Sequence, residues 1–447
     1  MRKSITVIAI FSLMFLGFSS LSHGAGFLIY EHGAAAMAMG GAFVGLANNP
    51  TAVFHNPAGI AFLDGTQISF GTTLIFPVAS LSMPDIDLFP VTPAYSETYD
   101  QASQVFYPSN FYITHKVSDR VVAGFGFFSP YGLGTEWPNS ETFPLRYLST
   151  KDDMKTFFFN PTLAFKLNEN LSLGVGVSYV HSTLKFYLDE LLVITPPVPP
   201  LLIDVPASLD AKGSAWGLNA GVLYKGENFS LGFNWRGGFT IDYEDGDLEL
   251  NLENVQAINP AAPDSLEGTV STSFKIPHIF GVGGAFNLSE KLMFTADFHY
   301  IAWSSFERFV AEVDVPNIEL IYPPGLADKE VEENWKDSWL FRFGFQYMAN
   351  ENLALRAGFL YDKTPQPDAS VDPILPDANR MAFTGGFGYK AGNFVIDVAY
   401  QYEPFADRAS ENRPDDLTLY QVGAVNLASG TYKTTAHLIG VSIGFIF

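Results

Sequence analysis

The sequence contains no cysteine, and its 25 basic residues are far outnumbered by 47 acidic ones, so the formal net charge is -22. Without cysteine the chain has no disulfide, no thiolate metal site and no cysteine nucleophile. The shortage of Lys and Arg argues against nucleic acid as a partner, because binding phosphates requires clustered positive charge. It argues equally against a polybasic membrane anchor.

Long hydrophobic runs are also missing beyond the N-terminus. No later segment offers the roughly 18 consecutive apolar residues that a transmembrane helix requires. The N-terminus has Arg2 and Lys3, then an uncharged stretch over 4–21, and then the small residues of Ser22-His23-Gly24. This pattern predicts a secretory signal peptide, residues 1–24, cleaved before Ala25. The alternative is a retained membrane anchor.

Charged residues make up only 16% of the chain, scarcely more than the 15% of aromatic residues, and there are 41 Phe and 39 Gly. This composition is poor for a helical enzyme. It suits a β-sheet with one face on lipid, aromatic residues at the membrane interfaces and small residues inside.

Alternation with a period of two dominates the sequence after residue 66, which is typical of strands with unlike faces. In 352–362, for example, Leu353, Leu355, Ala357, Phe359 and Tyr361 share one face. The pattern predicts fourteen strands, an even number, as expected of a single-chain outer-membrane barrel. Their expected ranges are 66–76, 105–116, 120–131, 153–166, 170–187, 212–225, 228–241, 268–286, 291–304, 335–348, 352–362, 379–390, 393–403 and 435–447.

The connections between these strands alternate in length. Six are short and polar, at 117–119, 167–170, 226–227, 288–290, 349–351 and 391–392, and long segments lie between them. Short periplasmic turns and long outer loops give this alternation; irregular loops of a large lectin-like protein are the alternative. The last strand ends on Phe447, and a terminal aromatic resembles the signal that the barrel-assembly machinery recognises.

The expected domains are therefore the signal peptide, an N-terminal segment over 25–65 and a barrel over 66–447. Residues 25–65 are rich in Gly and Ala and lack alternation, so we expect them to form a compact segment inside the barrel. The loop 188–211 is very apolar for an outer loop, and exposed apolar surface of that kind suggests a binding role.

Motifs for catalysis are weak. Gly440-Val441-Ser442-Ile443-Gly444 matches the hydrolase elbow, but Ser442 lies in the last alternating strand and leaves no room for the helix that the elbow needs. The acidic run 242–249 suggests either a calcium site or, more simply, a solvated hairpin tip. His181 and His299 are single histidines in strands, and no metal-site spacing is present. We expect no enzyme activity, no cofactor and no metal.

Short motifs in order along the chain resemble the FadL family of outer-membrane transporters of long-chain fatty acids and hydrocarbons. They are Ala25-Gly26-Phe27, Glu31, Gly40-Gly41-Ala42, Asn56-Pro57-Ala58-Gly59, Tyr131-Gly132-Leu133, Thr135-Glu136, Trp303-Ser304, Phe306, Trp335-Lys336-Asp337, Tyr361-Asp362, Pro365, Pro367, Pro376-Asp377 and Arg380. The resemblance implies an all-β fold: a 14-stranded antiparallel transmembrane barrel with an N-terminal hatch in its lumen, located in the bacterial outer membrane.

The resemblance also implies a passive route for a lipophilic ligand. The ligand binds an outer groove, enters a pocket beside the hatch N-terminus and leaves sideways into the bilayer at a kink in the third strand. The kink maps to Pro130-Tyr131-Gly132, where Pro130 cannot donate a ladder hydrogen bond; a strand end running into loop 132–152 is the alternative. The outer groove maps to Leu191, Leu192, Val193, Ile194, Leu201, Leu202 and Ile203, the pocket to Phe27, Leu188, Val331, Trp335 and Lys336, and the hatch to Glu31, Asn56, Pro57 and Ala58.

The chain departs from the fatty-acid members at the head-group site. Two basic positions that face the ligand carboxylate in the family align with Leu188 and Val331, and Lys185, Lys329 and Lys336 are the nearby cations. The cargo is therefore either a fatty acid or a hydrocarbon. The expected partners are this ligand, outer-membrane lipid and lipopolysaccharide, and the assembly machinery. A structural or adhesive barrel without transport is the alternative function, and an outer-membrane lipase acting through Ser442 is a third.

Overall fold

The structure, a computed structural model, describes residues 26–83, 98–138, 143–194, 201–318, 329–410, 421–422, 425–426 and 430–447. The predicted signal peptide lies outside these residues. None of the helices within the described ranges is long and apolar enough to cross a membrane.

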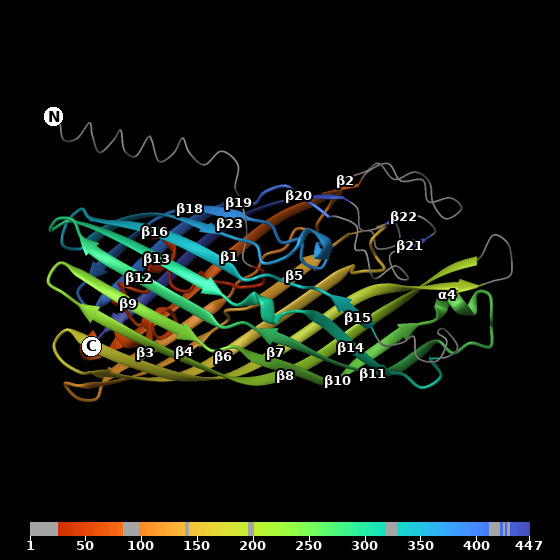
Figure 1. The fold of residues 1–447 in the computed structure, drawn as a ribbon, viewed down its shortest axis with the longest axis horizontal. Coiled ribbons are helices and arrows are strands. Elements are labelled where there is room, and N and C mark those ends of the chain that lie inside the picture. The colour runs from red at the N-terminus through yellow and green to blue at the C-terminus, as the bar shows by residue number, and fades with distance from the viewer. Residues whose placement is uncertain are drawn as a thin grey trace.

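The strands form one closed antiparallel barrel of fourteen strands, which confirms the prediction (Figure 1). The barrel closes where β1 (Thr66–Ser82) pairs with β23 (Thr431–Ile446) on one side and with β3 (Ser109–Lys116) on the other. The remaining single-piece strands are β6 (Lys151–Lys166), β7 (Leu171–Ile194), β8 (Leu201–Lys225), β17 (Leu353–Asp362), β18 (Arg380–Ala391) and β19 (Phe394–Pro404).

Five barrel strands are broken into two segments each, which alternation alone does not predict. They are β4 (Val121–Phe128) with β5 (Gly132–Glu136), β9 (Phe229–Arg236) with β10 (Phe239–Asn251), β11 (Ser265–Ile276) with β12 (Ile279–Asn287), β13 (Leu292–Ile301) with β14 (Arg308–Asp314), and β15 (Lys329–Glu332) with β16 (Ser338–Met348). The shorter elements are β2 (Thr98–Asp100), β20 (Arg408–Ala409), β21 (Gln421–Val422), β22 (Val425–Asn426), α2 (Ala34–Met37), α3 (Ala52–His55), η1 (Pro57–Phe62), α4 (Glu253–Gln256), η2 (Trp303–Ser305) and η4 (Asp368–Ser370).

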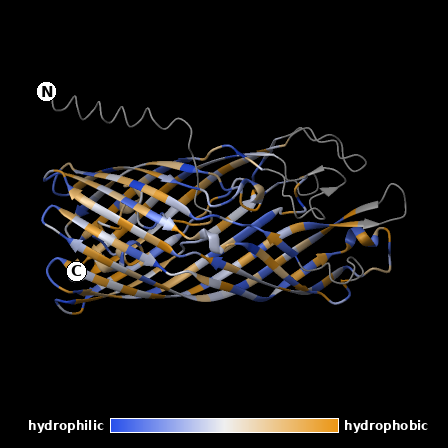
Figure 2. Cartoon of the chain, viewed as in Figure 1, coloured by the Kyte–Doolittle hydropathy of each residue, from blue (hydrophilic) through white to orange (hydrophobic). Residues whose placement is uncertain are grey.

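The six predicted short turns all join neighbouring strands at one end of the barrel, the end at which the C-terminus lies in Figure 1. The long connections lie at the opposite end. In outer-membrane barrels the short turns face the periplasm and the long connections face outward. The outer surface near the turn end carries exposed apolar side chains, and Figure 2 shows apolar residues alternating with polar ones along these strands. Examples of the exposed ones are Phe165, Val175, Leu218, Leu231, Val282, Phe343, Leu355, Phe387 and Val441.

Several segments expected to be connections are strands. β5 lies in the expected connection 132–152, and β14 and β15 lie in the expected connection 305–334. Two further cases concern segments for which the sequence suggests a role. Residues 188–211 belong largely to β7 and β8, whose pairing continues from Leu171 opposite Tyr224 to Ile194 opposite Leu201. The acidic run is not a hairpin tip, because it lies within β10, where the pairing register shifts between Tyr243 and Gly246. In both cases the strand pairing continues toward the end of the barrel that carries the long connections.

Residues 26–65, which we call the hatch, are almost entirely buried within the barrel. Glycines on the inner wall allow the hatch backbone to approach closely. A Cβ on Gly358 would lie 2.2 Å from the amide nitrogen of Gly40, and one on Gly174 would lie 2.3 Å from the carbonyl carbon of Pro57. Side chains at these two positions would push the hatch off the wall, which explains part of the glycine content.

Hydrogen bonds attach the hatch to strands from around the barrel. The Asp297 carboxylate on β13 accepts the amides of Phe43 and Val44 at 2.6 and 2.8 Å. The Ser442 hydroxyl on β23 accepts the amide of Ala34 at 2.9 Å. The Gln401 amide on β19 donates to Glu31 at 3.1 Å. These contacts hold the hatch against β13, β19 and β23.

Asn56 connects two parts of the hatch to the wall, and its loss should weaken the protein. Its side-chain nitrogen donates to the carbonyls of Val44 at 2.9 Å and Val222 at 3.1 Å, and its oxygen accepts the amide of Ala58 at 3.2 Å. An Asn56→Ala change leaves these buried groups unpaired, so we expect a loss of about 2 kcal/mol or more. Urea unfolding followed by the electrophoretic shift of the folded barrel measures it. The exposed Asn48→Ala change is the control and should stay within about 0.5 kcal/mol of the parent.

Candidate ligand pocket and strand gap

An apolar pocket of about 220 Å³ lies within the barrel, between the hatch and its outer end. Its walls are mainly aliphatic and aromatic, with contributions from β6, β7, β8, β10, β11 and β14 and from the segment before β18. Phe27, Leu188, Val331 and Trp335, which the sequence proposes for ligand binding, are among the lining residues, together with Leu133, Met154, Leu184, Phe186, Leu209, Leu248, Leu250, Val270, Phe274, Phe306, Phe309, Ala311 and Leu375. That they bind ligand stays a prediction.

Phe27 is the hatch residue in this lining, and it is packed among aromatic rings. Its centroid lies 4.7 Å from that of Trp303, 5.9 Å from that of Trp335 and 6.2 Å from that of Tyr131, mostly in edge-to-face geometry. Gly26, next to it, donates its amide to the Asp377 carboxylate at 3.0 Å. The start of the hatch is therefore held by contacts that a lipophile entering the pocket would compete for.

The charges of the pocket do not suit an anionic head group. Lys329 is the basic residue of the lining, and its Nζ lies 3.2 Å from a carboxylate oxygen of Glu190, which also lines the pocket. Asp152, Asp372 and Glu333 add further acidic groups. Lys336 is exposed and lies outside the lining, because it follows the buried Trp335 on the opposite face of the chain. Lys185 pairs with Asp210, and both side chains are about half exposed.

The residues proposed for the outer groove lie on the paired ends of β7 and β8. Ile203 is buried in an apolar cluster with Val205, Leu250, Leu252 and Val315, and Leu192 packs against it. These side chains thus contribute to a packed core above the pocket. Leu191 is half-buried opposite Asp204. The side chains of Val193, Ile194, Leu201 and Leu202 lie outside the described residues.

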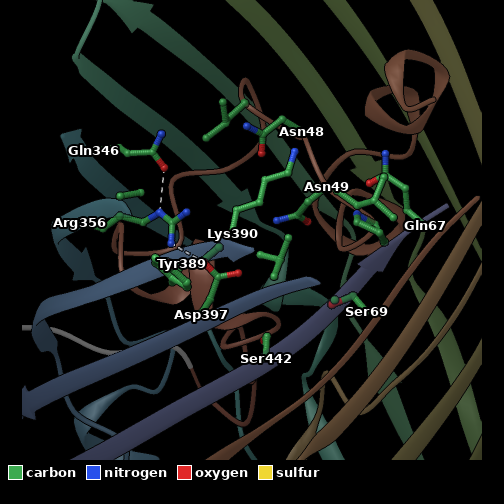
Figure 3. A pocket seen from close by; sticks show the side chains of 18 of the residues that line it. Asn48, Asn49, Gln67, Ser69, Gln346, Arg356, Tyr389, Lys390, Asp397 and Ser442 are labelled. Carbon is green, nitrogen blue, oxygen red and sulfur yellow. Dashed lines mark hydrogen bonds and ion pairs between the residues drawn. The ribbon is translucent and has the colours of Figure 1, made fainter. Parts of the chain in front are cut away.

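A second cavity, of about 290 Å³, lies at the turn end between the hatch and the wall formed by β1, β16–β19 and β23. Figure 3 shows its polar lining: Arg356 reaches both Gln346 and Asp397, with Asn48, Asn49 and Lys390 nearby. The Arg356–Asp397 pair has an N···O distance of 2.6 Å. Polar groups of this density suit water, so the apolar pocket is the better candidate for a lipophilic ligand.

The third barrel strand is interrupted at the position that the sequence suggests. β4 ends at Phe128 opposite Phe158, and β5 resumes at Gly132 opposite Lys155. Residues 129–131 thus oppose only residues 156 and 157 of β6, which is a β-bulge with one extra residue. The strand resumes beyond the bulge, so it does not simply end in loop 132–152.

The bulge separates the third strand from the second. β3 pairs with β4 no further than Phe111 opposite Phe127. Beyond that point Phe106 bridges to Ile75 of β1. Within the described residues, backbone hydrogen bonding to β5 returns at Ala102, whose amide donates to the Glu136 carbonyl at 2.7 Å. Between these two points the wall contains a gap, defined here as the separation of residues 103–110 from 128–135.

The hatch pairs with the edge of the third strand that the gap leaves without a partner. The Ile29 amide donates to the Pro130 carbonyl at 2.8 Å, and the Gly132 amide donates to the Phe27 carbonyl at 3.1 Å. An unpaired strand edge is very unfavourable at membrane depth, and this short hatch strand supplies the missing partners. The Phe106 ring also lies against Gly134 across the gap, since a Cβ there would be 2.5 Å from Phe106 Cε1. The sequence alone did not identify Phe106 as a residue of the gap. Its position opposite Gly134 follows from its bridge to Ile75 of β1, which the sequence does not reveal.

A lumen plugged by its own N-terminal segment, an apolar pocket above that plug and a lipid-facing wall define an outer-membrane transport barrel. The family model described as "Outer membrane protein transport protein (OMPP1/FadL/TodX)" matches residues 16–447. The chain belongs to this family and is located in the bacterial outer membrane.

Curated relatives and solved structures agree with this assignment. The long-chain fatty acid transport protein of Escherichia coli O6:H1 is 26% identical over 414 residues, covering 86% of this chain and 88% of the relative. Outer membrane protein P1 of Haemophilus influenzae is 23% identical, covering 81% and 83%. A FadL homologue of Pseudomonas aeruginosa shares the fold with a TM-score of 0.77 at 18% identity, covering 95% of this chain and all of that one. The toluene transporter TodX of P. putida has a TM-score of 0.68 at 16% identity, with 96% and 99% covered.

Proposed function

We propose that the protein is a passive channel that takes up hydrophobic compounds, long-chain fatty acids or hydrocarbons, and releases them sideways into the outer membrane. The observation that carries the proposal is the shared boundary of pocket and gap. Phe27 lines the apolar pocket, and its own carbonyl pairs with the free edge at Gly132. A ligand that displaces residues 27–29 would open the pocket and the gap together.

The energetics favour a lateral route over an aqueous one. Burying a methylene contributes about 0.8 kcal/mol, so a long acyl chain resists leaving an apolar environment for water by roughly 10 kcal/mol. A path from the pocket through the gap keeps the chain in apolar surroundings. The cavity at the turn end is lined by Arg356, Asp397 and Lys390 and would impose that penalty.

Filling the pocket tests this proposal. Ala311 is buried and lines the pocket, whereas its neighbour Glu312 on β14 is exposed on the outer face. We expect Ala311→Trp to reduce uptake of labelled oleate and of a labelled aromatic hydrocarbon about tenfold or more, because the indole takes up much of the available volume.

Glu312→Trp is the matched control and should leave uptake unchanged. Uptake is measured in cells that lack their own transporters, with surface amounts of folded barrel equalised. Normal uptake by a correctly assembled Ala311→Trp barrel would contradict the pocket assignment. If cells with the unmodified protein take up neither compound, the transport proposal fails and a structural or adhesive role takes its place.

A further inference from the structure

One carboxylate in the lining of the apolar pocket has an oxygen atom without a partner. Asp152, the second residue of β6, is only 2% exposed and lines the pocket. Its Oδ1 accepts the hydroxyl of Thr135 and, at 3.5 Å, that of Ser149. Its Oδ2 is buried and has no hydrogen-bond partner within the described part of the chain. Because a buried carboxylate oxygen needs a donor, the polypeptide leaves this one to be satisfied from the cavity.

Further acceptors surround the Asp152 carboxylate. The Thr135 hydroxyl, which contacts it, also lies 3.3 Å from the carbonyl oxygen of Pro373 and 3.5 Å from that of Ile374. One hydroxyl hydrogen cannot serve all three acceptors. The charged group that acts most strongly on Asp152 is another carboxylate, that of Asp372, which belongs to the same segment as the two carbonyls. We call this part of the lining, Asp152 with residues 372–374, the acceptor corner.

The basic residues near the pocket are engaged elsewhere. Among the lining residues that the structure describes, four are acidic and one is basic: Asp152, Glu190, Glu333, Asp372 and Lys329. The Nζ of Lys329 lies 3.2 Å from Glu190. Arg146, buried beside the lining residue Tyr147, pairs with Asp189 at 3.5 Å and with Asp204 at 3.0 Å. Neither cation pairs with Asp152, so the acceptor corner keeps its negative charge.

The rest of the pocket suits an alkyl chain that begins at Asp152. Met154 is the next buried residue along β6, and Asp152 itself lies opposite Phe186 of β7. Met154 and Leu184 belong to the same apolar cluster as Phe27 of the hatch. A head group held at Asp152 would therefore leave its chain lying along aliphatic walls toward the hatch.

We propose that Asp152 binds the ammonium group of lipophilic amines, so that the pocket takes long-chain primary amines as cargo. This inference rests on the proposed transport function and adds a substrate class to it. An ammonium group has three N–H donors, which suit the unpaired Oδ2 of Asp152 and the carbonyl oxygens of residues 373 and 374. Its charge also offsets two neighbouring carboxylates, whereas an anionic head group in the acceptor corner would be repelled by both.

The test compares decylamine, decanol and decanoate on the purified full-length protein in detergent. Tryptophan fluorescence reports binding, because Trp335 lines the pocket. A primary alkylamine carries a lysine-like ammonium group that is charged at pH 7. We expect the parent protein to bind decylamine at least about tenfold more tightly than decanoate. Asp152→Asn keeps the shape and removes the charge, so it should weaken decylamine binding about tenfold or more and change decanol binding less than about threefold.

Asp153→Asn is the matched control. Asp153 is the next residue of β6, lies outside the described pocket lining and pairs with Lys155. The control removes the same charge at the neighbouring position and should leave decylamine binding unchanged. Asp372→Asn covers the case in which Asp152→Asn fails to fold. Its side-chain oxygen can still accept the Ile374 amide, and we expect decylamine binding to fall a few-fold.

The outcomes separate the amine site from transport as such. A folded Asp152→Asn protein that binds decylamine as tightly as the parent, or a parent that prefers decanoate, overturns the amine site and leaves the transport proposal intact. An equal loss in Asp153→Asn overturns it too, because the effect would then be one of overall charge. If Asp152→Asn does not fold, unchanged binding by Asp372→Asn overturns it. If the parent binds none of the three compounds, the proposed function itself fails.

Discussion

Removal of the extra residue in the third strand is expected to abolish lateral release. In a variant that lacks Ser129 and carries Pro130→Thr, two residues instead of three would oppose residues 156 and 157 of β6. The strand would then run straight, with Phe128 and Tyr131 still facing inward, and its edge could pair with residues 103–108. We expect uptake of labelled oleate and hydrocarbon to fall at least tenfold, because the wall closes while the pocket stays in place.

The control for this variant is Gly132→Ala, which keeps the bulge. A Cβ at that position would lie 3.0 Å from the end of the Ile29 side chain and at an ordinary contact distance of 3.5 Å from the Met154 carbonyl oxygen, so the gap should remain and uptake should change little. Both proteins must show the electrophoretic shift of a folded barrel. Ligand binding by the deletion variant should survive, which separates a closed exit from a damaged pocket. Full uptake by a folded deletion variant would rule out release through the gap.

A reversible crosslink between the hatch and the gap edge should switch uptake off and on. Leu28 and Tyr131 face each other across the short bridge, flanked by the hydrogen bonds of Ile29 and Gly132. Opposed residues of this non-hydrogen-bonded type have Cα atoms about 4.5 Å apart, within the range that a disulfide spans. Because the chain has no cysteine, a Leu28→Cys, Tyr131→Cys protein contains a single possible disulfide.

We expect the oxidised double variant to take up at least tenfold less oleate than the same protein after reduction, because residues 27–29 cannot leave the edge. Each single-cysteine variant should be insensitive to the reductant, which isolates the crosslink from the loss of the Tyr131 ring. Equal uptake before and after reduction, with the disulfide verified by mass spectrometry, would mean that the hatch strand need not detach.

The barrel itself was predictable because its signals are local. Alternation, six short turns and the final strand ending on Phe447 can each be read from a few neighbouring residues, since side chains of a strand alternate whatever its partners are. The same reasoning failed at 188–211 and at 242–249, where β7, β8 and β10 continue toward the end of the barrel that carries the long connections. There the choice between loop and strand depends on pairing between distant segments, such as β10 with β8 and β11.

The sequence by itself thus determined the fold class, the family and the approximate position of the interruption, through Pro130 and Gly132. Only the tertiary structure decided that the interruption is a bulge of one residue, that the hatch strand covers its edge and that Phe106 lies against Gly134. The physical reason is that these contacts join residues far apart in the chain, and strand register and hatch position, not local composition, set which of them meet.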